Sequence, residues 1–394
     1  MRPHVRFLGV LVAALGVGAE SCTEVPPTDG AAEGEGEGEG EGEGEGEGEG
    51  EGEGEGEGEG EGEGEGEGEG EGEGEGEGEG EGEGEGEGEP DDGVFVIATF
   101  NTGSAGGARH DEGADDGYSS AQAEITTEYY GSGLSWLPAV EGTAAFLDLV
   151  RPDLIAFQEI FHTPECEQIP LEARIGYVCE DWSPGEPTVA QVVLGADYQV
   201  ACNLGKPDKC LAVHRSFGSI RGCAEDLCLD GLAGARVDEC GSGSRVGRGV
   251  IDLVAGGELT VVNFHGSSGG LPHDAECRRR QVEQVFENLD GEPGANGERN
   301  LVLGDFNTDP GRLALVDESA ERWNDFTEGT PFHFVTECGF DAVPTYDGLV
   351  NIDHVVSDAF DGDCAAAGIY GGLPSVLDFT YLDHTAIVCT LAGP

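Results

Sequence analysis

Two polar residues suited to phosphate chemistry stand close together in the stretch LGDFN, residues 303–307. Asp305 and Asn307 are two positions apart, with Phe306 between them. On an extended strand, residues at i and i+2 share one face. We therefore expect both polar side chains to point the same way while Phe306 packs into the core. A carboxylate can hold a metal ion or a water molecule, and an amide beside it can donate to a phosphate oxygen.

Similar polar residues occur at or beside the ends of other apolar runs. They are Asn101, Glu159, His265, Asp305 with Asn307, Asp353, and the pair Asp383 and His384. A sheet aligns strand ends along one edge, so residues far apart in the sequence can converge there. Hard oxygen ligands without thiols suit Mg²⁺, Mn²⁺ or Ca²⁺. The two histidines add groups that can change protonation near neutral pH.

The elements that must position these residues alternate between strand and helix. We expect buried strands at residues 93–101, 153–160, 198–204, 209–216, 247–254, 258–266, 299–307, 349–358 and 382–391. Helical spacing occurs at residues 137–152 and 275–289, and the Gly-, Asp- and Ser-rich residues 102–134 predict a long loop. Several of these strands are apolar on both faces. The pattern predicts a layered α/β protein whose sheets are covered by helices.

The N-terminal part of the chain predicts export and a tether. Residues 1–22 resemble a signal peptide, with a short basic start and an apolar run at residues 7–18. Cys22 follows at the place of a bacterial lipoprotein cysteine and is predicted to be lipidated. Residues 23–92 contain Glu-Gly repeated 28 times and predict a disordered acidic linker. We expect a protein held at the cell envelope or outer surface by a lipid anchor in the membrane, or a secreted one.

The charge of the chain limits its partners. The formal net charge is −64, and residues 91–394 carry 50 acidic and 16 basic residues. Only two of the basic residues are lysines, Lys206 and Lys209. Such an acidic surface disfavours loose binding of polyanions. A phosphate group can bind only where metal ions or a few cationic side chains reverse the local sign, although a high-salt habitat would also select this charge.

The cysteines predict a disulfide-stapled domain. Eleven of the 12 cysteines follow Cys22, and seven of them lie between Cys166 and Cys240. An exported protein is expected to form disulfides, and no spacing here matches a zinc site. The odd number predicts one free thiol, which we assign to Cys389 in an apolar run.

Taken together, six motifs resemble the endonuclease/exonuclease/phosphatase superfamily. They are ATFN, FQE, NFHG, LGDFN, NIDHVVSD and LDHTAI, in that order, within residues 93–391. That superfamily includes pancreatic-type deoxyribonuclease, abasic-site endonucleases, inositol-polyphosphate phosphatases and bacterial sphingomyelinases. The resemblance implies a catalytic domain over residues 93–394 with a four-layered α/β sandwich, in which two packed mixed β-sheets are flanked by helices. It also implies a divalent metal and in-line attack of water on a phosphoester.

The resemblance implies a role for each matching residue. The implied metal ligands are Glu159, Asp383 and Asn101. The implied catalytic residues are His265, Asp305, Asn307, Asp353 and His384, with His384 as base or electrostatic partner oriented by Asp353. The implied contacts with the substrate phosphate come from Arg248, Asn307 and His265. Deoxyribonucleases pair the first histidine with a carboxylate, and this sequence has Asn203 near that place.

Three functions remain open at this point. The first is an extracellular phosphodiesterase or nuclease, and the second is a hydrolase of a lipid or small phosphoester. For the second, GLSWLP at residues 133–138 is a meagre candidate for membrane insertion. The third is a non-catalytic, surface-displayed binding domain. In each case we expect a monomer, and we interpret the basic cluster CRRRQ at residues 277–281 as an ordinary helix face.

Overall fold

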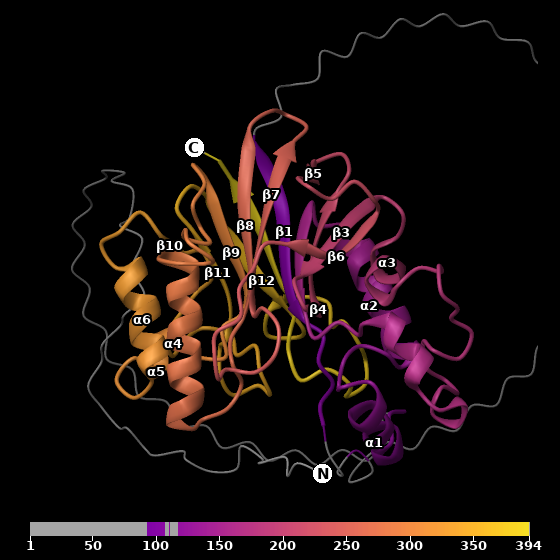
Figure 1. Cartoon of the computed structure of the whole chain (residues 1–394). Helices are drawn as coiled ribbons and strands as arrows, with labels where there is room; N and C mark the ends of the chain where they lie inside the picture. The colour runs from indigo at the N-terminus through magenta and orange to yellow at the C-terminus, as the bar shows by residue number, and fades with distance from the viewer. Residues whose placement is uncertain (1–92, 107–109, 111–116, 394) are drawn as a thin grey trace, which may run out of the picture. The chain divides into compact units, whose positions relative to one another are not determined.

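Two mixed β-sheets pack face to face in the computed structural model, which describes residues 93–106, 110 and 117–393 (Figure 1). The predictions for residues 1–22, for Cys22 and for the linker at 23–92 lie outside the described residues. No helix among the described residues is long and apolar enough to cross a membrane.

The larger sheet has eight strands in the order β13-β12-β14-β1-β2-β4-β3-β6. These strands are β1 (Val94–Asn101), β2 (Leu154–Gln158), β3 (Tyr198–Asn203), β4 (Lys206–His214), β6 (Leu227–Leu232), β12 (Asp361–Ala367), β13 (Gly372–Leu373) and β14 (Ile387–Ala392). The smaller sheet has six strands in the order β10-β11-β9-β8-β7-β5. Its strands are β5 (Gly218–Ile220), β7 (Val246–Leu253), β8 (Glu258–His265), β9 (Asn300–Asp305), β10 (His333–Phe334) and β11 (Asp353–Ser357).

Helices cover the outer faces of both sheets, so the layers run helix, sheet, sheet, helix. The α-helices are α1 (Ser120–Tyr129), α2 (Leu137–Val150), α3 (Val189–Leu194), α4 (Pro272–Phe286), α5 (Pro310–Leu313) and α6 (Glu318–Thr327), and two 3₁₀ helices are η1 (Thr163–Gln168) and η2 (Leu171–Ala173). Figure 1 shows α4, α5 and α6 on one side of the sheets and α2 and α3 on the other. This arrangement confirms the predicted four-layered α/β sandwich of two mixed sheets.

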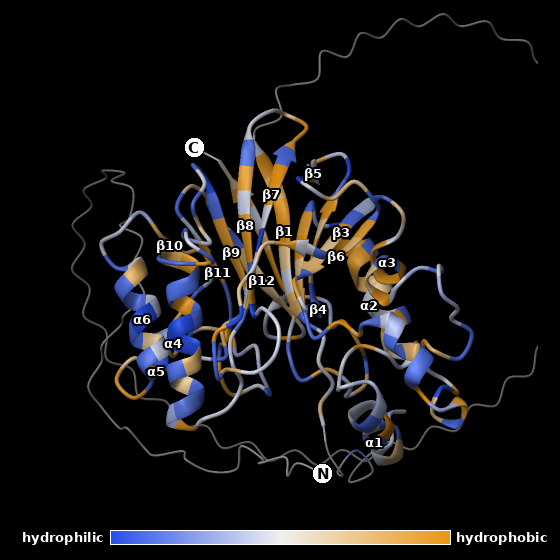
Figure 2. Ribbon diagram, viewed as in Figure 1, coloured by the Kyte–Doolittle hydropathy of each residue, from blue (hydrophilic) through white to orange (hydrophobic). Residues whose placement is uncertain are grey.

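Apolar side chains fill three spaces between these layers. Between the sheets, Ile97 and Leu154 of the larger sheet meet Leu303 and Val355 of the smaller one, all with no exposed surface. A second cluster joins the larger sheet to α1, α2 and α3, and a third joins the smaller sheet to α4 and α6 around Trp323. Figure 2 shows the apolar strands at the centre and the hydrophilic surfaces of α4 and α6. Burial of this apolar area is the main force that holds the layers together.

The long loop predicted for residues 102–134 is wrong in part, because α1 lies within it. Ser119 caps this helix by accepting a hydrogen bond from the Gln122 backbone, and the Gln122 side chain in turn accepts one from the Ser119 N–H. This reciprocal capping satisfies two backbone donors at the helix start. Ala123 and Thr126 then turn inward and are buried. A polar composition with two small buried contacts gives little hydrophobic periodicity, which explains why the sequence did not indicate the helix.

The prediction that Cys389 carries a free thiol is wrong, because Cys389 is bonded to Cys364 across the neighbouring strands β14 and β12. The described residues form five disulfides: Cys166–Cys179, Cys202–Cys210, Cys223–Cys228, Cys240–Cys277 and Cys364–Cys389. An apolar run is no sign of a free cysteine, since disulfides also lie in cores. The prediction of a disulfide-stapled domain is confirmed.

Candidate active site

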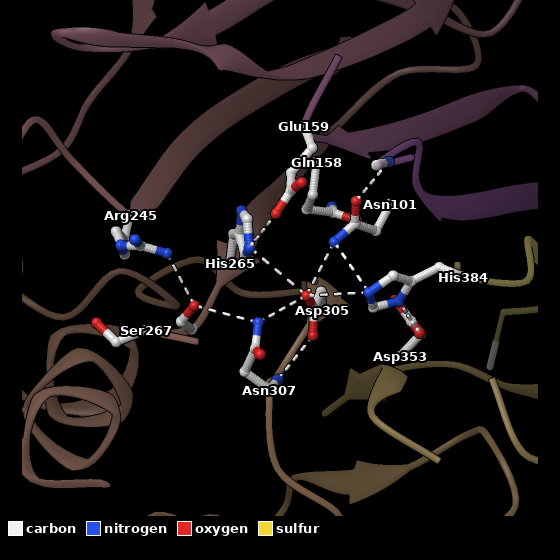
Figure 3. A network of polar contacts seen from close by, with 12 residues as sticks. Asn101, Gln158, Glu159, Arg245, His265, Ser267, Asp305, Asn307, Asp353 and His384 are labelled. Carbon is white, nitrogen blue, oxygen red and sulfur yellow. Dashed lines mark hydrogen bonds and ion pairs between the residues drawn. The ribbon is translucent and has the colours of Figure 1, made fainter. Parts of the chain in front are cut away.

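The strand directions bring the polar residues identified in the sequence to one edge of the sandwich. β1 runs parallel to β2, and β8 runs parallel to β9, so Asn101, Glu159, His265 and Asp305 all lie at or just after carboxyl ends. β11 is antiparallel to β9 and pairs Asp353 with Asp305. β14 is antiparallel to β1, so the Asp383–His384 segment just before β14 reaches the same edge. Figure 3 shows the side chains of Asn101, Glu159, His265, Asp353 and His384 around Asp305.

Asp305 is the focus of this network. Its side chain is 1% exposed. Its Oδ2 accepts hydrogen bonds from Asn101 Nδ2 at 2.9 Å and from Asn307 Nδ2 at 2.7 Å. The same oxygen lies 3.5 Å from His265 Nε2 and 3.8 Å from His384 Nε2. Burial raises the pKa of Asp305 to about 7, although His384 opposes the shift. A carboxylate with such a pKa can accept a proton near neutral pH.

The expected pairing of Asp305 with Asn307 is present, but strand geometry is not its cause. β9 ends at Asp305, and Asn307 has a φ of 52°, in the left-handed region. This turn is closed by the Asn307 N–H, which donates to Asp305 Oδ1 at 2.7 Å. Between them, Phe306 has no exposed surface and stacks on Trp323 of α6 with ring centroids 3.9 Å apart. Burial of the Phe306 ring therefore holds a backbone conformation that costs on the order of 1–3 kcal/mol.

His384 and Asp353 form a dyad on one side of Asp305. His384 Nδ1 donates to Asp353 Oδ2 at 2.8 Å, and both side chains are buried. Burial alone would lower the pKa of His384, but the carboxylates of Asp353, Asp305 and Asp383 together raise it well above its ordinary value. Tyr346, which the sequence did not indicate, lies against this ring with centroids 4.8 Å apart. The dyad can therefore place a positive charge beside Asp305.

His265 lies on the other side of Asp305 and has the opposite electrostatics. It is 4% exposed, and neither ring nitrogen has a hydrogen-bond partner in the part of the chain that the structure describes. Its Nε2 lies 3.4 Å from Glu159 Oε1. Burial lowers the pKa of His265 well below its ordinary value, and the charges of Lys209 and Arg245 add to this shift. A neutral imidazole in this position can donate one hydrogen bond to an incoming oxygen.

Three oxygen donors near Glu159 fit a hard divalent cation. Glu159 is one-third exposed and has a φ of 55°, so an uncommon backbone conformation presents its carboxylate at the end of β2. Burial raises the pKa of Asp383 to about 7, and Glu159 is among the charges that raise it further, while Asp383 Oδ1 is buried without a partner. The Asn101 amide oxygen accepts from the Gly103 N–H at 2.9 Å. These acidic and amide oxygens are the ligands that Mg²⁺, Mn²⁺ and Ca²⁺ prefer.

A second group of possible ligands is better described as the hydrogen-bonded His384–Asp353 dyad with Asp305 beside it. Asp305, Asp353 and His384 place ligand atoms within 4.8 Å of one another. However, His384 Nδ1 is committed to Asp353, and a histidine with a raised pKa keeps its proton, whereas a metal-bound nitrogen must lose it. The acidic and amide oxygens on the Glu159 side therefore suit a hard cation better than this group does.

A polar network beneath the site links the two sheets. Asn263 of β8 is fully buried and donates to the carbonyls of Phe157 in β2 and Cys210 in β4, at 3.1 Å each. Its amide oxygen accepts from Gln158 Nε2 at 3.0 Å. Gln158 directly precedes Glu159, and Asn263 lies two residues before His265. These bonds therefore fix the positions of Glu159 and His265 relative to each other.

The structure does not bring two of the residues considered in the sequence to this site. Arg248 of β7 forms an ion pair with Glu292 at 2.7 Å instead. The arginine at the site is Arg245, which precedes β7 and donates from Nη1 to Gly266 O at 2.9 Å. Asn203 donates to the Ser244 carbonyl at 3.4 Å and does not contact His265.

The sequence could not distinguish Arg245 from Arg248. The resemblance to deoxyribonucleases requires only an arginine at the start of the strand that precedes the His265 strand. Both arginines meet that description. The segment GLSWLP, considered above for membrane insertion, is part of the folded domain. Its Trp136 is only 8% exposed and packs against Tyr118. That segment is part of the core and offers no aromatic side chain for membrane insertion.

No protein-family model matches the chain, and no curated protein matches it. Among solved structures, an endonuclease/exonuclease/phosphatase from Beutenbergia cavernae DSM 12333 is 16% identical, covers 76% of this chain and 72% of its own, and has a TM-score of 0.47. A functionally unknown conserved protein from Enterococcus faecalis V583 is 13% identical over 76% and 100%, with a TM-score of 0.44.

The catalytic domain of human Nocturnin with bound sulfate is also similar, at 13% identity over 76% of this chain and 94% of that one, with a TM-score of 0.43. Similarity in this range does not assign the chain to a family. The function must be argued from the site itself.

Proposed function

We propose that this protein is a divalent-metal-dependent phosphoester hydrolase, and that it acts as a phosphodiesterase or nuclease outside the cell. The observation that carries the proposal is the convergence on Asp305: two amides and two imidazoles surround one buried carboxylate. Oxygen donors for a cation stand beside it. The ordered motifs in the sequence support the same chemistry.

The side chains divide the work of in-line hydrolysis among them. Asp305 accepts a proton from the attacking water as the new P–O bond forms, and the bond to the leaving group breaks on the opposite side. Asn307 and the neutral His265 donate hydrogen bonds to the phosphoryl oxygens. The His384–Asp353 dyad supplies positive charge as negative charge develops on phosphorus. No covalent bond between enzyme and substrate is required.

Glu159, Asp383 and the amide oxygen of Asn101 would hold the cation. When bound, a divalent ion neutralises charge on the phosphoryl oxygens and stabilises the transition state. Gly103 allows this approach, since a Cβ there would lie 2.6 Å from Glu159 Oε2. Asp383 Oδ1, which has no hydrogen-bond partner among residues 93–106, 110 and 117–393, would gain a ligand contact.

The proposal extends to the setting of the domain. We propose that the protein is exported and acts as a monomer, with lipidated Cys22 as its membrane anchor and the Glu-Gly tract as its tether. Labelling of cells with a radioactive fatty acid tests the anchor. Incorporation that is lost in Cys22→Ala supports it, and equal incorporation in both chains would contradict it.

An assay of the full chain tests the enzymatic function. The purified protein is incubated with plasmid DNA, bis-p-nitrophenyl phosphate or sphingomyelin, each with Mg²⁺ and with EDTA. We expect Mg²⁺-dependent cleavage of DNA and of the small diester. Release of choline phosphate alone would assign the protein to the lipid alternative, and inactivity toward all three substrates would favour the non-catalytic binding domain.

A matched pair of variants locates the activity. Glu159→Gln should lower kcat/KM by at least about 100-fold, as loss of a group that stabilises the transition state does. The control is Glu165→Gln, an exposed glutamate six residues further along, which should keep full activity. Thermal unfolding of both variants checks that the fold is intact. Full activity of Glu159→Gln would refute this site.

A further inference from the structure

The two lysines of the chain lie together near the candidate site. Lys206 and Lys209 lie at the start of β4 and both bind Asp208, with each Nζ 2.8 Å from one of its carboxylate oxygens. The side chain of Lys209 is fully buried, whereas those of Lys206 and Asp208 are 28% exposed. We call Lys206, Asp208, Lys209 and Arg245 the cationic cluster.

Backbone hydrogen bonds join this cluster to the site. The Asp208 carbonyl accepts from the N–H of Ile160, the residue after Glu159, at 2.9 Å. The Arg245 carbonyl accepts from the His265 N–H at 3.0 Å. The Arg245 guanidinium donates to Gly266 O, which also accepts from Asn307 Nδ2 at 3.3 Å. Figure 3 shows Arg245 on the side of His265 and Asn307, away from His384 and Asp353.

The charge of the cluster opposes the charge of the domain. The cluster holds three basic residues and one carboxylate, whereas residues 91–394 as a whole carry about three times as many acidic as basic residues. Burial would raise the pKa of Asp208, but Lys209 and Lys206 lower it below its ordinary value, so the carboxylate is ionised. Burial lowers the pKa of Lys209 to about 7, so Lys206 and Arg245 are the more strongly basic members of the cluster. Arg245 has no carboxylate hydrogen-bond partner among the described residues, and a buried guanidinium without an anion costs free energy.

The cluster also has unused hydrogen-bonding capacity directed toward a partner. Among the described residues, Arg245 Nε is buried without a hydrogen-bond partner, and so is Nδ1 of the adjacent His265. Lys206 keeps part of its side chain in solvent, where an ammonium group can reach a ligand. A guanidinium fork beside ammonium groups is a favourable environment for a phosphate oxygen.

We propose that the cationic cluster binds a second phosphate group of the substrate, next to the phosphoester that is cleaved. This inference rests on the proposed function. The substrate class is therefore a phosphoester with a second phosphate close to the one that is cleaved, such as a nucleotide chain or a nucleotide with a further phosphate, and a substrate with one phosphodiester leaves the cluster empty. The second phosphate comes either from the adjacent unit of a nucleic acid backbone or from a terminal phosphomonoester.

Three chromogenic substrates test the inference in the full chain. The first is the p-nitrophenyl ester of thymidine 5′-phosphate, with a single diester. The second carries an added 3′-phosphate, and the third carries a 3′-linked second nucleotide. We expect Lys206→Gln to lower kcat/KM about 10-fold on the second and third substrates, the usual effect of losing one charged hydrogen bond, and less than about 2-fold on the first. An effect confined to the second or to the third substrate identifies the source of the phosphate.

The control variant is Arg215→Gln, which removes a half-exposed cation just after the same strand, where it pairs with Asp226. It should change none of the three values. Equal losses of Lys206→Gln on all three substrates, or no loss on any, would overturn the inference. Because Lys206 is partly exposed, its replacement should leave the melting temperature within a few degrees of the unaltered chain.

A binding measurement can test the cationic cluster independently of the proposed hydrolase activity. Calorimetry with Ca²⁺ compares thymidine 5′-phosphate with thymidine 3′,5′-bisphosphate, which requires no turnover. We expect the 3′-phosphate to add about 10-fold in affinity in the unaltered chain and little in Lys206→Gln. If the protein hydrolyses no substrate but binds the bisphosphate more tightly in this way, the cluster is a phosphate-binding site and only the proposed hydrolase activity is refuted. Equal affinities of the two nucleotides would overturn the cluster's role.

Discussion

Arg278 of α4 is a buried cation whose removal should be costly. Its Nη1 donates to the carbonyls of Ser267 at 2.8 Å and Gly269 at 2.7 Å. Its Nε donates to Ser319 Oγ at 3.0 Å, and its Nη2 donates to Asp317 Oδ2 at 2.8 Å. All four bonds lie at a residue that is 3% exposed. Arg278→Met leaves the Asp317 charge and two carbonyls without this partner, so we expect the free energy of unfolding to fall by about 3–5 kcal/mol.

The neighbouring arginine provides a matched control in the same helix. Arg279 is 30% exposed and pairs with Glu276 and Glu283 on the helix surface. Arg279→Met should change the free energy of unfolding by less than about 1 kcal/mol, because exposed ion pairs contribute little. Denaturant unfolding of both full-length variants under oxidising conditions measures the difference. If the two variants lose stability equally, the assignment of Arg278 as a buried anchor is wrong.

The same variant has a functional consequence. Ser267 and Gly269 belong to the segment that follows His265, so their release should loosen the position of that imidazole. A variant that retains part of the geometry, Arg278→Lys, should be intermediate in both stability and kcat. A variant with lowered stability and unchanged kcat/KM would show that the segment after His265 does not need this anchor.

Three further predictions concern other parts of the account. Burial lowers the pKa of His354 to about 4, so between pH 6.5 and 4 this histidine binds a proton in the unfolded chain but not in the folded one. As the pH falls through that window, the contribution of His354 to the free energy of unfolding should fall by about 3 kcal/mol. The stability difference between the unaltered chain and His354→Gln should shrink by the same amount. Asn263→Leu removes three buried hydrogen bonds and should lower the free energy of unfolding, measured in denaturant, by about 3 kcal/mol. The control Asn288→Ala, at an exposed position, should lower it by less than about 1 kcal/mol. Calorimetry should show at least about 10-fold weaker Mn²⁺ binding in Glu159→Gln and unchanged binding in Glu165→Gln.

Much of the fold could be predicted because its strands are apolar on both faces. Buried strands of a sandwich have this composition, and their polar ends mark where the chain leaves the core. The residues around Asp305 could be placed together for the same reason, since strand ends share an edge. The relative distances could not be predicted, because they depend on the register between β9 and β11 and on contacts such as Asn263 with Phe157.

Other features depend on contacts that leave no local pattern. The sequence CRRRQ gives no sign that Arg278 is buried while Arg279 is not, because the difference arises from Asp317, which is 39 positions away from Arg278. Lys206 and Lys209 looked like minor residues in an acidic chain. Only the pairing of β4 with β2 places them beside Glu159.

The cation is expected to lie on the Glu159 side of the site. A crystal of the full chain soaked in Mn²⁺ and measured at the manganese absorption edge would locate the ion by its anomalous signal. The account predicts a peak within about 2.5 Å of carboxylate oxygens of Glu159 and Asp383. A peak between Asp353 and His384, or none at this edge of the sandwich, would contradict it.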